Sequence, residues 1–163
     1  MITIVLGGAR SGKSAVAEGL CCGRVVYVAT YVPGEDDPDM AARVAAHRAR
    51  RPADWTTVEA GPLGVVGAVT EAGRWATLLI DSLTTWVAGS PGFLVDGAGL
   101  VAALAAREGD AVVVSDEVGL GVHPSTEAGR RFRDRLGDLN QLVAGMADEV
   151  LLVVAGRALR LGP

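Results

Sequence analysis

The sequence predicts an α/β fold with a mainly parallel central sheet and helices on both of its faces. Short apolar runs rich in β-branched residues recur along the chain, and stretches with helical spacing separate most of them. These runs are continuous and do not alternate with polar residues, which is typical of strands that are buried on both faces. Ligands are therefore expected at the carboxyl ends of the strands. The predicted strands cover residues 2–6, 25–29, 77–80, 111–114 and 150–154.

The first apolar run leads directly into a glycine-rich segment with the pattern G-x-x-x-x-G-K-S, and a helix-compatible stretch follows at residues 15–18. Glycines in such a segment let backbone N–H groups point at phosphate oxygens, and the helix offers the positive end of its dipole. We therefore predict a phosphate-binding loop (P-loop), in which Lys13 contacts the β- and γ-phosphates and the Ser14 hydroxyl holds Mg²⁺. The predicted loop consists of Gly7, Gly8, Ala9, Arg10, Ser11, Gly12, Lys13 and Ser14.

An ordinary Gly/Ser-rich surface loop is the alternative, and the choice of basic residues argues against it. The chain has fifteen lysines and arginines in total, and Lys13 is the only lysine among them. Lysine stands where a compact ammonium suits a phosphate better than the planar guanidinium of arginine does. This composition supports the P-loop interpretation.

Length and composition predict one globular domain over residues 1–163, large enough to bury a substantial core. Half of the residues are hydrophobic and the mean hydropathy is +0.33, which argues against disorder. The net charge of −4, without a long basic run, argues against a nucleic-acid-binding surface. No apolar stretch approaches the roughly 20 residues of a membrane span, and no signal peptide precedes the loop, so we expect a cytoplasmic protein. Cys21 and Cys22 are expected to be buried thiols at the end of the first helix.

The segment after the second strand predicts a helix over residues 38–50 that carries a histidine. Asp37 is a typical N-cap and Pro38 suits the first helical position, while Pro52 ends the helix. His47 shares a face with apolar residues, so a histidine packed on the body of the protein is one interpretation. Its neighbours favour another, because arginines are the preferred partners of phosphate groups. These arginines are Arg43, Arg48, Arg50 and Arg51.

Two of the predicted strands end in carboxylates, which is the form expected of the second acidic motif in P-loop enzymes. Asp81 ends one of them, and Asp116 and Glu117 end the other. The sequence does not settle which of the two strands lies beside the first. We favour Asp81 for the metal and keep Glu117 as a second candidate, while a carboxylate that caps a turn is the alternative for either. His123, in the loop that follows, is expected to be solvated, with a role as a second base as the alternative.

The remaining chain predicts two more helices and an edge hairpin. Residues 89–99 form a glycine-rich connection, and a helix follows over residues 100–107. Ser125 is a plausible N-cap for a long helix that continues through Gly145. The last apolar run is followed by residues 159–161, which are expected to return as its hairpin partner at the sheet edge.

Several short motifs accompany the P-loop in a fixed order. They are Tyr27-Val28-Ala29-Thr30, Met40-Ala41-Ala42-Arg43-Val44 with His47 and Arg51-Pro52, Trp55 with Glu59, Glu117-Val118-Gly119 with Gly121, Arg131-Phe132-Arg133-Asp134 with Asn140-Gln141, and Ala147-Asp148-Glu149-Val150. The P-loop alone is shared by a great many families, whereas this combination is far more specific. With it, nearly the whole chain resembles the bifunctional adenosylcobinamide kinase/adenosylcobinamide-phosphate guanylyltransferase family of cobalamin biosynthesis.

The resemblance implies a RecA-like P-loop fold, usually assembled as a homotrimer, and a reaction in two steps. ATP or GTP first phosphorylates the aminopropanol hydroxyl of adenosylcobinamide. A histidine then attacks the α-phosphate of GTP, pyrophosphate leaves, and the bound GMP passes to adenosylcobinamide-phosphate to give adenosylcobinamide-GDP. By resemblance, His47 is the guanylylated histidine and Asp81 is the acidic residue at a strand end. The remaining nucleotide-associated positions are Arg48, Ala49, Arg50, Arg51 and Glu59.

The surroundings of His47 suit a nucleophilic role. An imidazole attacks as the neutral base, and its ordinary pKa of about 6.5 leaves most of it neutral at cytoplasmic pH. Neighbouring arginines lower this pKa further, because they repel the imidazolium form, and they also stabilise charge on phosphoryl oxygens.

The departures of the chain from the family pattern are modest. Asp116 stands where the family commonly has asparagine, and residues 87–100 form a shorter stretch than usual.

Two other functions remain open. A small-molecule kinase without the guanylyl-transfer step is one alternative, and it would not need His47. A RecA-like regulatory protein that binds nucleotide and only changes shape is the other, and it would show no turnover.

Overall fold

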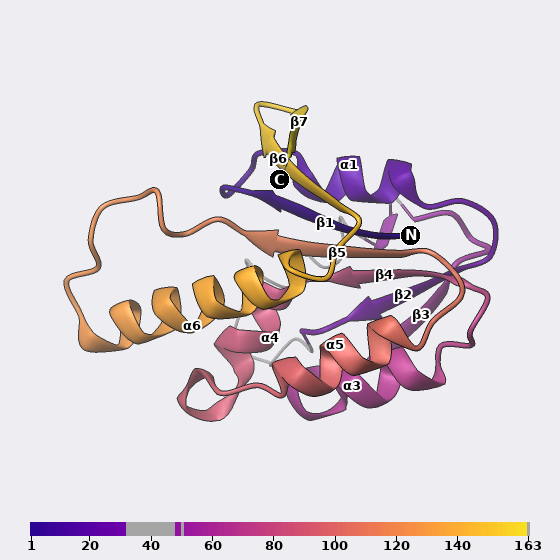
Figure 1. Ribbon diagram of the computed structural model, residues 1–163, viewed down its shortest axis with the longest axis horizontal. Helices are drawn as coiled ribbons and strands as arrows, with labels where there is room; N and C mark the ends of the chain where they lie inside the picture. The colour runs from indigo at the N-terminus through magenta and orange to yellow at the C-terminus, as the bar shows by residue number, and fades with distance from the viewer. Residues whose placement is uncertain (32–47, 50, 163) are drawn as a thin grey trace.

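The computed structural model describes residues 1–31, 48–49 and 51–162, which are built around one seven-stranded sheet (Figure 1). The strand order is β3-β2-β4-β5-β1-β6-β7. The strands are β1 (Ile2–Gly7), β2 (Val25–Ala29), β3 (Thr56–Glu59), β4 (Thr77–Asp81), β5 (Ala111–Asp116), β6 (Glu149–Val154) and β7 (Arg157–Leu161). The helices are α1 (Lys13–Leu20), α3 (Gly61–Glu71), α4 (Leu83–Gly89), the short 3₁₀ turn η1 (Pro91–Phe93), α5 (Gly97–Ala105) and α6 (Glu127–Ala144).

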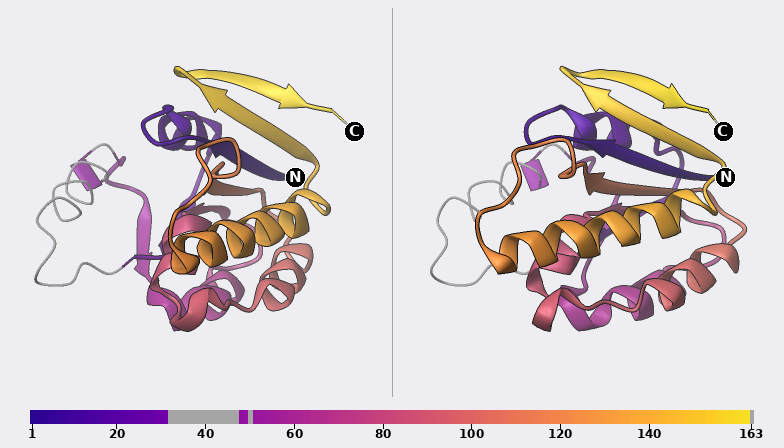
Figure 2. Two further views of the ribbon diagram at one scale, coloured as in Figure 1. Left: turned by 90° about the vertical axis from the view of Figure 1, so that its left-hand side faces the viewer. Right: turned by 60° about the vertical axis from the view of Figure 1, so that its left-hand side comes forward.

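The sheet is parallel apart from its last pair of strands. β6 and β7 form an antiparallel hairpin at one edge of the sheet, drawn in yellow in Figure 2. All five predicted strands are present, and the predicted edge hairpin is confirmed, with its second strand starting at residue 157 instead of 159. The α/β fold with a mainly parallel sheet is therefore confirmed.

Residues along each central strand alternate between two buried layers. Val5 of β1 and Val114 of β5 pack with Ala17 of α1 on one face. Their neighbours in the chain, Ile4 and Val113, belong to a larger core on the opposite face. That face is covered by α3, α4, α5 and α6 (Figure 1). Because both faces are apolar, the strands show no polar alternation in sequence.

The sequence-based prediction omits β3, α3 and α4, each of which has a weak local signal. Three of the four residues of β3 are exposed, and the strand lies at the sheet edge, so no apolar run marks it. The sequence of α3 contains three glycines, which lower helix propensity. α4 is only seven residues long and includes two adjacent threonines. Packing of these helices against the sheet compensates for their low propensity.

Two predicted helix starts are wrong by a few residues. Thr126, and not Ser125, caps α6: the Gly129 N–H donates to Thr126 Oγ1 at 3.1 Å. α5 begins inside the predicted glycine-rich connection, because the Asp96 carboxylate accepts a hydrogen bond from the Gly99 N–H at 2.8 Å. The helix predicted over residues 38–50 lies outside the described residues, apart from the helical residues 48 and 49. Within the described part of the chain, no helix has both the length and the apolar character needed to cross a membrane.

The prediction that both thiols are buried is wrong, because even Cys21 is only partly buried. Cys21 packs at the edge of the core beneath α1, and its thiol donates to the Ala17 carbonyl at 3.3 Å. Burial, reinforced by the neighbouring Cys22 and Glu18, raises the pKa of Cys21 to about 12. Cys22 is exposed. α1 ends at Leu20, so Cys21 is its C-cap and Cys22 lies beyond the helix.

Candidate active site at the carboxyl edge of the sheet

The carboxyl ends of neighbouring strands bring the predicted site residues to one edge of the sheet. Gly7 lies opposite Asp116 across β1 and β5, and Asp81 lies opposite Ala29 across β4 and β2. Ala29 also lies opposite Glu59 across β2 and β3. Four strand spacings of about 4.8 Å separate the ends of β1 and β3, or roughly 19 Å. The P-loop and Glu59 therefore occupy two parts of the same edge.

The predicted P-loop connects β1 to α1, in the strand–loop–helix context that such a loop needs. Gly12 has a φ of 92°, a left-handed conformation that suits glycine. The turn between β6 and β7 supports the loop, because the Gly156 N–H donates to the Ser11 carbonyl at 2.7 Å. A Cβ atom on Gly12 would lie 3.1 Å from the Gly156 Cα. The loop is thus packed closely against the hairpin at the sheet edge.

The Lys13 ammonium is held at the base of this loop. It forms an ion pair with the Asp116 carboxylate and also donates to the Gly8 carbonyl, 3.3 Å away. Both side chains of the pair are largely buried, with 13% of Lys13 and 23% of Asp116 exposed. The predicted site did not include Asp116. Its position at the end of a buried strand was the available signal, but only the pairing of β5 with β1 brings it to Lys13.

Of the two strands that end in carboxylates, β5 is the one that lies beside β1, which answers the question that the sequence leaves open. Asp81 ends β4, one strand further away, and its Oδ2 accepts a hydrogen bond from the Tyr27 hydroxyl at 2.9 Å. Burial, followed by the charge of Asp81, raises the pKa of the Tyr27 phenol. Tyr27 therefore stays protonated and keeps donating to this carboxylate. The role of Asp81 in metal binding stays a prediction.

The Glu117 carboxylate forms a hydrogen bond within its own loop. Its Oε1 accepts a hydrogen bond from the Gly119 N–H at 2.6 Å, and its own N–H donates to the Gly7 carbonyl at 3.2 Å. This geometry corresponds to the turn-capping alternative. His123, in the same loop, is exposed, as expected for a solvated histidine.

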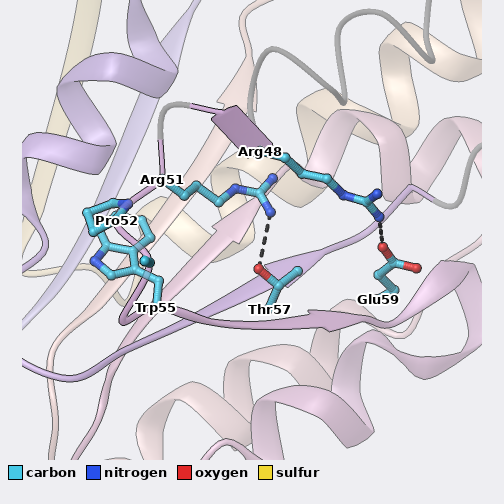
Figure 3. Close-up of a pocket in the computed structure, with 7 residues that line it drawn as sticks. Arg48, Arg51, Pro52, Trp55, Thr57 and Glu59 are labelled. Atoms are coloured by element: carbon cyan, nitrogen blue, oxygen red, sulfur yellow. Dashed lines mark hydrogen bonds and ion pairs between the residues drawn. The ribbon is translucent and has the colours of Figure 1, made fainter.

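A cavity of about 370 Å³ lies beside β3, at the end of the carboxyl edge that is farther from the P-loop (Figure 3). Arg48 forms an ion pair with Glu59, and the Arg51 guanidinium donates to Thr57 Oγ1 at 3.3 Å. Arg51 also stacks over the Tyr27 ring, with its guanidinium carbon 3.3 Å from the ring centroid. Its Nε is buried without a hydrogen-bond partner among the described residues. The cavity is lined by Arg48, Arg51, Pro52, Ala53, Trp55, Thr57 and Glu59.

Three of the predicted nucleotide residues thus meet in this cavity, and the others have different positions. Arg48, Arg51 and Glu59 line the cavity, whereas Ala49, the residue after Arg48 in the chain, is exposed. His47 and Arg50 lie outside the described residues. A cavity of this volume falls in the range of small-ligand sites, and guanidinium groups such as those of Arg48 and Arg51 are suited to an anionic ligand.

The oxygen donors near the P-loop suit Mg²⁺. This ion is usually held by one or two carboxylates or hydroxyls, together with waters and substrate phosphates. The Ser14 hydroxyl and the carboxylates at the ends of β4 and β5 are ligands of this kind. Across the residues that the structure describes, no three His, Cys, Asp or Glu side chains form a metal cluster by themselves. The donor set therefore fits an ion that is bound partly by nucleotide phosphates.

Comparisons with known proteins agree on one family. A family model described as cobinamide kinase / cobinamide phosphate guanyltransferase matches residues 3–161. The chain is 42% identical to the bifunctional adenosylcobalamin biosynthesis protein CobP of Pseudomonas aeruginosa, over 96% of this chain and 94% of that protein. It is 34% identical to the bifunctional adenosylcobalamin biosynthesis protein CobU of Salmonella typhimurium, over 96% of this chain and 97% of that protein.

Among solved structures, the P4 protein of bacteriophage phi6 in complex with ADP resembles the chain with a TM-score of 0.52 and 14% sequence identity. The match covers 97% of this chain and 53% of that one, so the chain spans about half the length of the phage protein. At this identity the likeness concerns the fold, and it agrees with the predicted RecA-like P-loop architecture.

Proposed function

Because the chain belongs to the cobinamide kinase / cobinamide phosphate guanyltransferase family, we propose that it catalyses both reactions of a bifunctional enzyme of cobalamin biosynthesis. It phosphorylates adenosylcobinamide with ATP or GTP. It then transfers GMP from GTP to adenosylcobinamide-phosphate, which gives adenosylcobinamide-GDP and pyrophosphate. The proposal places the enzyme in the cytoplasm, where both nucleotides are available.

The P-loop serves the kinase step in this proposal. Its backbone N–H groups and the N-terminus of α1 bind the phosphates, and Lys13 stabilises the charge on the β- and γ-phosphates. The Ser14 hydroxyl and the Asp81 carboxylate hold Mg²⁺, with Tyr27 fixing the orientation of Asp81 through its hydrogen bond. Mg²⁺, when bound, neutralises charge on the phosphate oxygens.

The arginine-lined cavity serves guanylyl transfer, and it is the observation that carries this half of the proposal. Arg48 follows His47 directly in the chain, and Arg48 and Arg51 both line the cavity. The neutral His47 imidazole attacks the α-phosphorus of GTP, and the bond to the pyrophosphate oxygen breaks. A phosphate oxygen of adenosylcobinamide-phosphate then displaces the imidazole. The two guanidinium groups stabilise the phosphoryl oxygens in both displacements.

We further propose that the enzyme assembles as a homotrimer, as the resemblance to the family implies. Light scattering on the purified protein should then give a mass of about three 16.7-kDa chains. A mass of one chain at all concentrations would contradict the trimer without affecting the proposed reactions.

The guanylyl-histidine is tested by the intact mass of the protein after incubation with GTP and Mg²⁺. The wild type should gain one GMP, in a linkage that is labile in acid and stable in alkali, and His47→Ala should gain none. The chain has only two histidines, so His123→Ala is a matched control that should gain GMP like the wild type. If the wild type binds GTP but forms no adduct, the proposed guanylyl transfer through His47 is wrong, and a kinase without guanylyl transfer is favoured.

A further inference from the structure

The ion pair between Lys13 and Asp116 places a carboxylate inside the proposed phosphate site. The Asp116 oxygen contacts the ammonium that is expected to bind the β- and γ-phosphates. With most of both side chains removed from solvent, the two charges interact more strongly than a surface pair would. Any phosphate that draws Lys13 away therefore leaves Asp116 without this cation.

Asp116 is also fixed in position by its backbone. Its N–H donates to Thr84 Oγ1 of α4 at 2.8 Å, and its carbonyl accepts from Asn140 Nδ2 of α6 at 3.1 Å. Its register partner is Gly7, the first residue of the P-loop. Two helices and the neighbouring strand thus hold Asp116 beside the loop, so its backbone has little freedom to withdraw from an arriving phosphate.

A polyanion next to this carboxylate is unfavourable, because like charges a few ångströms apart repel each other in a partly buried site. The repulsion disappears when a cation takes the place of Lys13 beside Asp116. A divalent cation bound to the nucleotide carries the required charge, and carboxylates are among its preferred ligands. Asparagine at this position would bring no such repulsion, since it is neutral.

We propose that Asp116 couples nucleotide binding to a divalent cation. In the free enzyme Asp116 holds the Lys13 ammonium; in the complex Lys13 binds the phosphates and the cation neutralises Asp116. The enzyme thereby discriminates in favour of the metal-bound nucleotide and against the metal-free one. This inference rests on the proposed nucleotide binding at the P-loop and extends it to one named residue.

Titration calorimetry with the β,γ-imido analogue of GTP tests the coupling, first in excess EDTA and then in Mg²⁺. Asp116→Asn should bind the metal-free analogue about tenfold more tightly than the wild type, within the usual range of coupling between two ligands. In Mg²⁺ the two proteins should bind within about twofold of each other. Asp138→Asn is the matched control, because it removes an exposed carboxylate from α6, on the opposite face of the sheet from α1 (Figure 1). It should behave as the wild type does in both conditions.

Coupling between two ligands is reciprocal, which gives a second measurement. The affinity for Mn²⁺ in the nucleotide complex, followed by electron paramagnetic resonance, should fall about tenfold in Asp116→Asn. If Asp116 only positions Lys13, the variant will instead bind the analogue less tightly in EDTA and in Mg²⁺ alike, and the proposal is wrong. If the wild type binds the analogue in neither condition, the proposed nucleotide site itself fails; if it binds equally well in both, only the coupling fails.

Discussion

Lys13→Ala is expected to lower kcat/KM for phosphoryl transfer by about 10² to 10³-fold, the usual effect of removing a group that stabilises charge in the transition state. Lys13 is the only lysine in the chain, and its ammonium already lies at the base of the P-loop, held by Asp116 and the Gly8 carbonyl. Its loss also leaves the Asp116 carboxylate facing the phosphates without an opposing charge. Steady-state kinetics with adenosylcobinamide and ATP, together with nucleotide binding, measure the effect.

Lys13→Arg separates charge from shape at this position. Arginine keeps the positive charge but replaces a compact ammonium with a planar guanidinium on a longer side chain. We expect the kcat/KM of Lys13→Arg to remain well below that of the wild type. Lys13→Ala should also lower the unfolding temperature, because it leaves the largely buried Asp116 carboxylate without its partner. Wild-type turnover in Lys13→Ala would show that phosphoryl transfer takes place elsewhere.

Gly7→Ala is expected to destabilise the fold and to distort the P-loop. A Cβ atom on Gly7 would lie 2.5 Å from Ser11 Oγ and 2.7 Å from the Val153 carbonyl oxygen. The carbonyl belongs to β6, so relieving the clash requires β1 and β6 to move apart. Overpacking of this kind costs about 1–3 kcal/mol. For a domain of this size, the melting temperature should then fall by roughly 2–12 °C.

Gly8→Ala is the control for this prediction, because a Cβ atom on Gly8 meets no atom of the described residues within 4 Å. Its melting temperature in the absence of nucleotide should stay within about 1 °C of the wild type, as is usual for a substitution without a steric conflict. Equal melting temperatures for the two variants would contradict the steric argument. Both variants are compared by differential scanning calorimetry without ligand, so that binding does not contribute.

The sequence by itself determined the elements whose signal is local. Five strands are marked by continuous apolar runs, and the P-loop is marked by the spacing of its glycines and Lys13. β3 was not predicted because an exposed edge strand has no apolar run. α3 and α4 were not predicted because their helix propensity is low and packing against the sheet stabilises them. The cap of α6 was missed by one residue, since Ser125 and Thr126 both carry a hydroxyl that can cap a helix.

Only the tertiary structure decided how the strand ends are combined into a site. An apolar run reports that a strand is buried, but it does not identify the strands that flank it. The pairing of β5 with β1 therefore could not be read from the pattern, although it brings Asp116 to Lys13 across 103 positions of the chain. The stacking of Arg51 on Tyr27 and the cavity beside Glu59 likewise depend on β3 lying next to β2. Contacts between residues far apart in sequence are determined by the packing of whole elements, so local periodicity does not predict them.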